Sequence, residues 1–227
     1  GIKQKAGLKR VTLELGSNAA VIIDEDVELT DEIIERVKWG AFVNNGQVCI
    51  SVQRVFVHDT KIHEFLSKLK KAMESVVVGD PLLEETDVSA LISKKDVERI
   101  DMWVQEAIKE GATVLCGGKK QDARIFEPTV LTNVPDHVSV QCQEVFGPLM
   151  TVNTFKEFDE AIEQVNNSRY GLQAGVFTNN LFKAMRAIDE LEVGGVMIND
   201  IPTFRVDHMP YGGVKESGTG REGIKYA

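Results

Sequence analysis

Short β-branched runs alternate along this chain with segments whose apolar residues recur at helical spacing, and this alternation restricts the fold more than any other feature. The runs predict strands at 11–15, 20–23, 52–57, 113–116, 126–134, 149–155, 174–178 and 195–199. The helical spacing predicts helices at 31–44, with Thr30 as the N-cap, and at 62–73, 97–110, 158–165 and 181–191. Strands that alternate with helices indicate an α/β domain of three layers, with a mainly parallel sheet and helices on both faces.

Two details of this sheet can be predicted as well. Pro128 lacks a backbone N–H, so we expect the strand at 126–134 to lie at an edge of the sheet. In open parallel sheets, functional sites lie at the carboxyl ends of the strands, and we expect the same here. No internal repeat, low-complexity segment or linker interrupts the 227 residues, which predicts one domain.

Composition and charge exclude several classes of partner. The formal net charge of -9 argues against nucleic acid and against an anionic membrane surface, and no apolar run approaches the about 20 residues of a membrane helix. Neither the four histidines nor the three cysteines show the spacing of metal ligands, so we expect no metal site. Unpaired, widely separated cysteines indicate free thiols in a reducing compartment and hence a cytoplasmic protein.

Cys49 lies in the segment 43–51, where a predicted helix ends and a predicted strand has not yet begun. Gly46 interrupts the helical pattern three residues earlier. A turn of this kind presents side chains at the end of a sheet, where binding and chemistry commonly occur. Taken alone, Cys49 is either an inert buried thiol or a nucleophile.

Two further segments carry carboxylates in unusual places. Leu13-Glu14-Leu15-Gly16 sets Glu14 inside an apolar strand, where it is either exposed on an edge strand or partly buried with a raised pKa that suits a general base. Glu144-Val145-Phe146-Gly147-Pro148 sets a carboxylate and an aromatic ring in a rigid turn. By itself this second segment is also what a turn with one exposed acid looks like, which is the commoner situation for a single motif of this kind.

Together and in this order, the motifs resemble those of the aldehyde dehydrogenase superfamily. Leu13–Gly16 is similar to its glutamate motif, Asn45–Cys49 to its cysteine motif and Glu144–Pro148 to its third signature. The run from Pro210 to Gly218 followed by Gly220–Gly223 resembles the end of its catalytic domain. The resemblance covers only the later half of the family's chain, which implies that the cofactor-binding domain is missing and that residues 1–15 are its tail.

The resemblance implies a role for each motif. Cys49 would attack an aldehyde to give a thiohemiacetal, hydride transfer to NAD or NADP would leave a thioester, and Glu14 would activate the water that hydrolyses it to the carboxylic acid. Glu144 and Phe146 would contact the nicotinamide end of a cofactor that the missing half mainly binds. Members that transfer the acyl group to coenzyme A tend to lack a glutamate at the position of Glu14, so the resemblance favours a hydrolytic enzyme.

We expect the substrate pocket to be lined by the neighbours of Cys49 and by residues near the end of the chain: Val48, Ile50, Phe204 and Tyr211. The run 202–210 resembles the branch of the family that oxidises lactaldehyde, semialdehydes and phosphorylated aldehydes. Arg205 in this run would bind the anionic tail of such a substrate. Alternatively, Arg205 pairs with an acid such as Asp207 or lies at a subunit contact.

The sequence is compatible with three interpretations of the whole chain. It is the catalytic half of an NAD(P)-dependent aldehyde dehydrogenase that is inactive by itself, a non-enzymatic interaction module, or a cofactor-independent thiol esterase that uses Cys49 and Glu14. Loss of the cofactor domain would expose apolar surface, so we also expect a homo-oligomer.

Overall fold

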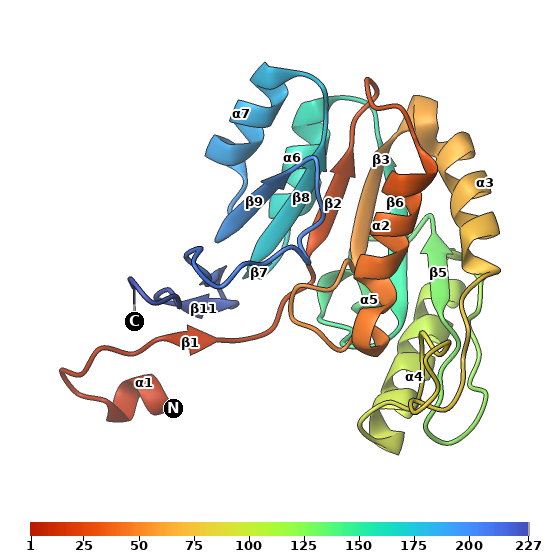
Figure 1. Ribbon diagram of the computed structural model, residues 1–227, viewed down its shortest axis with the longest axis horizontal. Coiled ribbons are helices and arrows are strands. Elements are labelled where there is room, and N and C mark those ends of the chain that lie inside the picture. Colours follow the sequence, from red (N-terminus) through yellow and green to blue (C-terminus); the bar gives the residue numbers. More distant parts are fainter. Residues whose placement is uncertain (227) are drawn as a thin grey trace.

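A seven-stranded sheet forms the centre of the computed structural model, which describes residues 1–226 (Figure 1). The strand order is β4-β5-β6-β3-β2-β8-β9. The strands are β2 (Ala20–Ile23), β3 (Arg54–His58), β4 (Thr113–Cys116), β5 (Thr129–Thr132), β6 (Leu149–Phe155), β8 (Gln173–Phe177) and β9 (Gly195–Ile198). Every neighbouring pair is parallel except β4 and β5. The predicted mainly parallel sheet is confirmed.

Helices cover both faces of the sheet, because successive strand residues point to opposite sides. Val21 and Ile23 of β2 face the core beneath α2 (Asp31–Phe42) and α3 (Ile62–Met73), whereas Ala20 and Ile22 pack in the core beneath α6 (Phe158–Asn166) and α7 (Leu181–Glu190). α4 (Lys94–Lys109) packs on Leu131 of β5 in a neighbouring core. The three-layer α/β architecture that the sequence predicted is therefore confirmed.

Local capping explains where the helices begin. Thr30 is the N-cap of α2, as predicted, and its side chain accepts a hydrogen bond from the Ile33 N–H. α4 begins at Lys94, earlier than the apolar pattern indicates, because the Ser93 side chain caps it by accepting the Asp96 N–H. Apolar periodicity marks the buried face of a helix and does not register a polar first turn.

The predicted edge position of the strand at 126–134 is wrong. β5 lies between β4 and β6, and all four of its residues are buried. β4 pairs antiparallel with β5 on the side away from β6, so β4 is the edge strand of the sheet. Pro128 costs no hydrogen bond in this sheet because it immediately precedes the first residue of β5.

The two ends of the chain meet in small sheets outside the central one. β1 (Leu13–Glu14) pairs antiparallel with β11 (Gly218–Thr219), and β7 (Tyr170–Gly171) pairs with β10 (Val214–Lys215). The strand predicted at 11–15 is therefore shorter than expected and does not join the main sheet. Figure 1 shows the arm that carries α1 (Ile2–Lys5) reaching away from the body on the side where the C-terminus lies.

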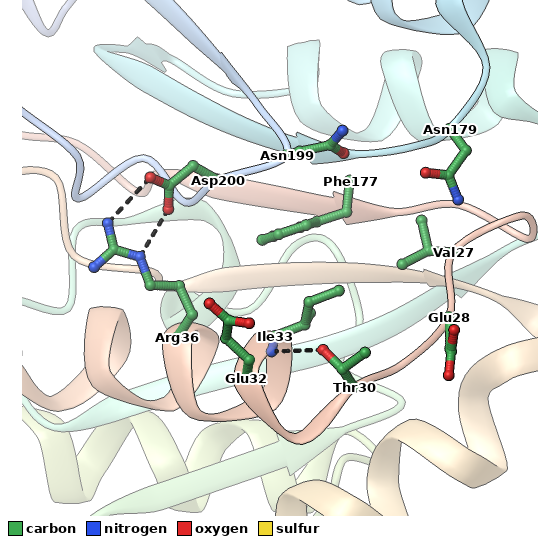
Figure 2. A pocket seen from close by; sticks show the side chains of 10 residues that line it. All are labelled: Val27, Glu28, Thr30, Glu32, Ile33, Arg36, Phe177, Asn179, Asn199 and Asp200. Carbon is green, nitrogen blue, oxygen red and sulfur yellow. Dashed lines mark hydrogen bonds and ion pairs between the residues drawn. The ribbon is translucent and has the colours of Figure 1, made fainter.

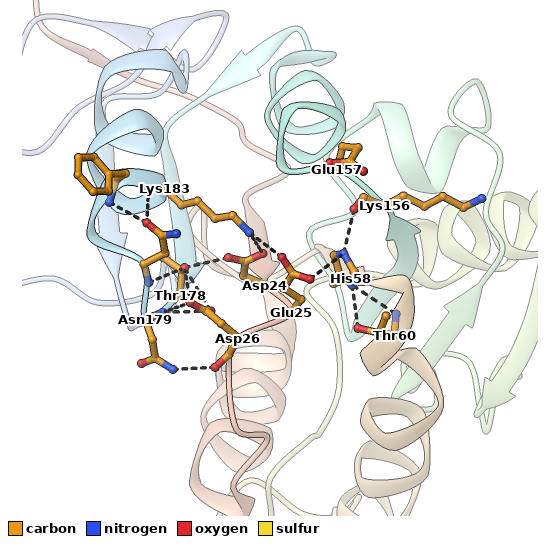
Figure 3. Close-up of polar contacts among 12 residues, drawn as sticks. Asp24, Glu25, Asp26, His58, Thr60, Lys156, Glu157, Thr178, Asn179 and Lys183 are labelled. Carbon is orange, nitrogen blue, oxygen red and sulfur yellow. Dashed lines mark hydrogen bonds and ion pairs between the residues drawn. The ribbon is translucent and has the colours of Figure 1, made fainter.

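Charged and polar groups close the carboxyl edge of the sheet (Figure 3). Asp24, which follows β2, is fully buried and accepts hydrogen bonds from the Thr178 hydroxyl and the Lys183 ammonium, both at 2.9 Å. Asp26 accepts the backbone N–H of Asn179 at 3.1 Å. Because a buried carboxylate requires such partners, these contacts fix the loop after β2 against the loop after β8 and the start of α7.

Two kinds of feature are missing from the described part of the chain. None of the helices within residues 1–226 combines the length and the apolarity that a membrane span requires. In the same residues, no three His, Cys, Asp or Glu side chains are grouped in a way that could hold a metal ion.

Candidate active site

Cys49 follows a turn between α2 and β3 that has an uncommon backbone conformation. Asn44, Asn45 and Gly46 follow one another with φ of 51°, 61° and 67°, in the left-handed region that Asn and Gly adopt at least cost. A Cβ on Gly46 would lie 2.1 Å from the carbonyl oxygen of Gly147, so glycine alone permits the close approach. The turn before Cys49 is therefore packed directly on the turn that contains Gly147.

The sulfur of Cys49 lies 2.9 Å from the hydroxyl oxygen of Tyr211. Cys49 is half-buried and, together with Val48, packs against the buried group of Ile50, Leu172 and Tyr211. Burial, and next the hydrogen bond with Cys49, raise the pKa of Tyr211 far above its usual value. The phenol is thus protonated at neutral pH. Three of the predicted pocket residues, Val48, Ile50 and Tyr211, therefore lie around Cys49.

Glu14 reaches the same place from the other end of the chain, through the pairing of β1 with β11. Its Oε1 lies 3.1 Å from the position that a Cβ on Gly212 would occupy, next to Tyr211. Both carboxylate oxygens are buried, and neither has a hydrogen-bond partner among residues 1–226. Burial and then the charge of Glu222 raise the pKa of Glu14, while Arg205 and Arg221 oppose the rise.

Arg205 has an acidic partner, but not the one that the sequence suggested. Its guanidinium bonds to Glu222 at 3.2 Å and stacks over the ring of Tyr211, with its central carbon 4.2 Å from the ring centroid. Asp207 is therefore the wrong partner. Phe204 is 38% exposed and is not part of the apolar group around Cys49.

Glu144 lies against the turn that follows Glu14. Its Oε1 accepts the backbone N–H of Ser17 at 2.9 Å, and its Oε2 lies 2.7 Å from the position that a Cβ on Gly16 would take. Burial raises the pKa of Glu144, and the Ser17 N–H and the charge of Arg99 oppose the rise. Gly16 thus lets the glutamate motif and the third signature touch.

The backbone around Phe146 is held under constraint. Phe146 has φ of 47°, which is rare for an aromatic residue and is maintained only by surrounding contacts. Buried Gln53 supplies them: its side chain accepts the Val145 N–H at 2.9 Å and donates to the carbonyls of Gln143 and Val140 at 2.7 and 2.9 Å. Strain of this kind concentrates at functional sites.

All of these segments lie at the amino edge of the sheet. The turn at 16–18 precedes β2, Cys49 precedes β3, and the turn at 144–148 precedes β6. The expectation of a site at the carboxyl ends is therefore wrong for these residues. The carboxyl edge instead holds the ion pairs of Figure 3.

A cavity of about 520 Å³ lies elsewhere, between α2 and the ends of β8 and β9 (Figure 2). None of the predicted site residues lines it. Its one arginine, Arg36, is engaged by both carboxylate oxygens of Asp200, at 2.8 and 3.1 Å. Since no cysteine lines this cavity, the candidate site remains the group around Cys49.

Sequence reasoning missed three residues of the site: Ser17, Gln53 and Glu222. Gly220-Arg221-Glu222-Gly223 stood out as a motif, but nothing in it indicated that Glu222 would bond to Arg205. Ser17 acts through its backbone N–H, which every non-proline residue carries, so no sequence signal could have identified it. In the sequence, Gln53 is a single polar residue within a predicted strand, which carries no special signal.

The family model described as the aldehyde dehydrogenase family matches residues 1–227. The chain belongs to the aldehyde dehydrogenase family. A relative with 51% identity over 226 residues is the 3-sulfolactaldehyde dehydrogenase of Priestia aryabhattai, which covers 100% of this chain and of which 47% is matched. Family membership confirms the resemblance that the four motifs indicated.

Solved structures of the aldehyde dehydrogenase family have the same fold. Aldehyde dehydrogenase 21 from Physcomitrella patens, in complex with the reaction product succinate, matches 99% of this chain and 47% of its own, with a TM-score of 0.95 and 41% identity. Glyceraldehyde-3-phosphate dehydrogenase GapN from Methanocaldococcus jannaschii, complexed with NADP, matches 99% and 48%, with a TM-score of 0.94 and 40% identity. The chain spans about half the length of the relatives it matches.

Proposed function

We propose that this chain forms the catalytic half of an NAD(P)-dependent aldehyde dehydrogenase, which oxidises an aldehyde to a carboxylic acid. The observation that carries the proposal is the convergence on Tyr211 of a half-buried thiol and of a buried carboxyl group that has no hydrogen-bond partner among residues 1–226. Tyr211 bonds to Cys49, and the charge of Glu14 is close enough to contribute to the raised pKa of Tyr211. A soft nucleophile beside a carboxyl of raised pKa is the pair that forming and hydrolysing a thioester requires.

In the proposed reaction, the thiolate of Cys49 attacks the aldehyde carbon and forms a thiohemiacetal. The nicotinamide, when bound, supplies the acceptor for the hydride that leaves this carbon. Cys49 then carries the acyl group as a thioester. Glu14 removes a proton from a water molecule, which attacks the thioester carbon and releases the carboxylic acid and the Cys49 thiolate.

Glu144 and Phe146 are the residues of this chain that we assign to the cofactor. The Ser17 N–H holds one carboxylate oxygen of Glu144, which leaves the other as an acceptor for a sugar hydroxyl. Phe146 follows two residues later in the constrained turn, where the side chain of Gln53 accepts the N–H of the preceding residue, Val145. These features fit a nicotinamide riboside, and we place the remaining cofactor contacts in the half of the relatives that this chain does not cover.

We further propose that the substrate carries an anionic tail and that Arg205 binds it. Arg205 is the guanidinium next to Tyr211, and its present partner, Glu222, is a half-exposed carboxylate that a substrate carboxylate, sulfonate or phosphate can replace. The relatives support this class, since their names include 3-sulfolactaldehyde and glyceraldehyde 3-phosphate, and one of their structures holds the product succinate.

Nicotinamide reduction tests the proposed function. The chain is assayed alone and as the complemented chain, meaning together with a separate polypeptide that covers the other half of the relatives' length. We expect turnover of short aldehydes only by the complemented chain, because most cofactor contacts lie outside residues 1–227. A correctly folded, complemented chain that reduces neither NAD nor NADP with any aldehyde would contradict the proposal and favour a non-enzymatic interaction module.

A cofactor-independent thiol esterase is the second candidate, because Cys49 and Glu14 both lie in this chain. The same samples decide between the two functions when they are given an activated ester without nicotinamide. Cleavage by the uncomplemented chain at many turnovers per Cys49 would favour the esterase. A single acylation of Cys49 that is not followed by Glu14-dependent turnover would not favour the esterase.

Arg205→Gln is expected to discriminate between classes of aldehyde. In the complemented chain, loss of a charge-assisted hydrogen bond should raise KM for a carboxylate- or sulfonate-bearing aldehyde about 10- to 100-fold. KM for a neutral aldehyde of the same length should change less than about threefold. Arg186→Gln is the matched control, because Arg186 is a similarly exposed arginine in an ion pair on α7. Equal rises in KM for both aldehydes would contradict the assignment.

A further inference from the structure

The hydroxyl of Tyr211 contacts the atom that the proposed mechanism uses as its nucleophile. We propose that Tyr211 donates its O–H to the Cys49 thiolate. This hydrogen bond stabilises the negative charge on the sulfur and fixes the orientation of the Cys49 side chain. This inference rests on the proposed function, in which Cys49 is the nucleophile. It adds a side-chain donor to a step that the motifs alone assign to Cys49 and Glu14.

The direction of this hydrogen bond follows from the chemistry of its two atoms. In the neutral state, either the thiol or the phenol can donate across the 2.9 Å contact. A thiolate has no proton, so in the reactive state only the Tyr211 O–H can donate. Burial of Tyr211, which is 3% exposed, keeps the phenol protonated. A hydrogen bond to an anion is stronger than one to a neutral acceptor, and the contact therefore favours the thiolate.

The ring of Tyr211 is fixed from three sides, so the hydroxyl is aimed before any substrate binds. Its backbone exchanges two hydrogen bonds with Glu222, at 3.1 and 2.6 Å. Ile50 and Leu172 pack against the side chain. Arg205 lies over the ring face at 4.2 Å and is itself bonded to Glu222. A cation over the ring withdraws electron density from the phenol and strengthens its O–H as a donor.

The donor has its effect in the two states in which the sulfur is an anion. Before attack, it donates to the anionic sulfur and stabilises its charge. During thioester hydrolysis, it stabilises the thiolate as the leaving group when the bond between sulfur and the acyl carbon breaks. In the thiohemiacetal and the thioester, the sulfur is neutral and accepts more weakly, so the contact favours the charged states over the covalent ones.

The rate at which iodoacetamide alkylates Cys49 as a function of pH tests this inference without any cofactor. Peptide mass spectrometry separates Cys49 from Cys116 and Cys142. In Tyr211→Phe, we expect the midpoint of the profile to move up by about one pH unit, because one charge-assisted hydrogen bond is lost. At pH values below both midpoints, labelling should be about threefold slower than in the unmodified chain; above both, it should be about threefold faster, because a more basic thiolate is more nucleophilic.

This crossing of the two profiles separates a lost donor from a damaged fold, which would shift the rates in one direction at every pH. Tyr170→Phe is the control: Tyr170 also lies beside an arginine, Arg169, but bonds to no cysteine, and its profile should match the unmodified chain. If circular dichroism shows that Tyr211→Phe does not fold, Arg205→Gln is the second variant. We expect the midpoint of its labelling profile to move in the same direction by a smaller amount.

The outcomes distinguish this inference from the function on which it rests. Unchanged profiles in Tyr211→Phe and Arg205→Gln, with rapid labelling of Cys49 in the unmodified chain, would overturn the role of Tyr211 and leave Cys49 as the nucleophile. Labelling of Cys49 no faster than that of Cys116 in the unmodified chain would overturn both.

Discussion

Cys49→Ala is expected to lower aldehyde oxidation by the complemented chain about 10⁴-fold or more, because every later step requires the acyl group on this sulfur. Nicotinamide reduction at saturating aldehyde measures the loss. Since Cys49 is half-buried and its neighbours form their own apolar group, the substitution should leave the fold intact. Circular dichroism and thermal unfolding check this point.

The other two cysteines provide the matched controls. Burial raises the pKa of Cys116, whose thiol is therefore less reactive than an exposed one. Cys142 is the last residue of α5 (Ser139–Cys142), just before the third signature, and its thiol contacts the carbonyl of His137 at 3.6 Å. Cys116→Ala and Cys142→Ala should each retain activity within about threefold of the unmodified chain. Residual oxidation by Cys49→Ala above about one per cent would contradict its role as the nucleophile.

Glu14→Gln is expected to separate the two halves of the reaction. The variant should still form the thioester and release one equivalent of reduced nicotinamide per site, and then turn over about 10²- to 10⁴-fold more slowly, because no base activates the hydrolytic water. Rapid mixing resolves the burst from the steady state. A variant in which burst and steady state fall together would show that Glu14 acts before the thioester is formed.

The raised pKa of Glu14 gives this prediction a pH dependence. The carboxyl group is a base only when it is ionised, so steady-state turnover of the unmodified protein should fall as the pH decreases through the raised pKa, at higher pH than for an ordinary glutamate. The slow turnover of Glu14→Gln should be flat over the same interval. Both profiles come from one buffer series.

The same shift predicts an effect on stability. Because the folded state favours the neutral carboxyl, Glu14 contributes stability that is present below the pKa of an unfolded glutamate and is lost as the pH rises through the folded pKa. A neutral amide avoids this loss, so Glu14→Gln should unfold at an equal or higher temperature at pH 7, although it has lost turnover. A clearly lower unfolding temperature of Glu14→Gln would contradict the raised pKa of Glu14.

Local signals in the sequence predicted much of the fold. Thr30 marks the start of α2 because an N-cap acts within its own first turn. The alternation of Val21 and Ile23 with Ala20 and Ile22 is consistent with a strand buried on both faces. The motif around Cys49 predicted the turn, because Gly46 is the residue that the close approach to Gly147 requires.

Features that depend on distant pairing were not predictable in the same way. β5 lost its edge position to β4, whose four residues give no sign that they would pair antiparallel. The contact between Arg205 and Glu222 joins two surface loops, which the backbone bridge between Tyr211 and Glu222 brings together. The general rule for parallel sheets pointed to the carboxyl edge, but here ion pairs such as Asp24 with Lys183 occupy it.

The pairing of β1 with β11 determines when, during synthesis, the proposed site becomes complete. Glu14 leaves the ribosome before Cys49 does, but the hydroxyl of Ser217, 201 residues after Gly16, bonds to the carbonyl of Gly16 and holds the adjoining turn. A nascent chain can therefore fold the sheet and the turn before Cys49 while Glu14, the proposed base, is not yet held in position. Residues 205–219 are translated after the strands of the central sheet and bring together the thiol, the carboxyl group and the arginine, so a nascent chain that stops before them displays a thiol but no assembled site.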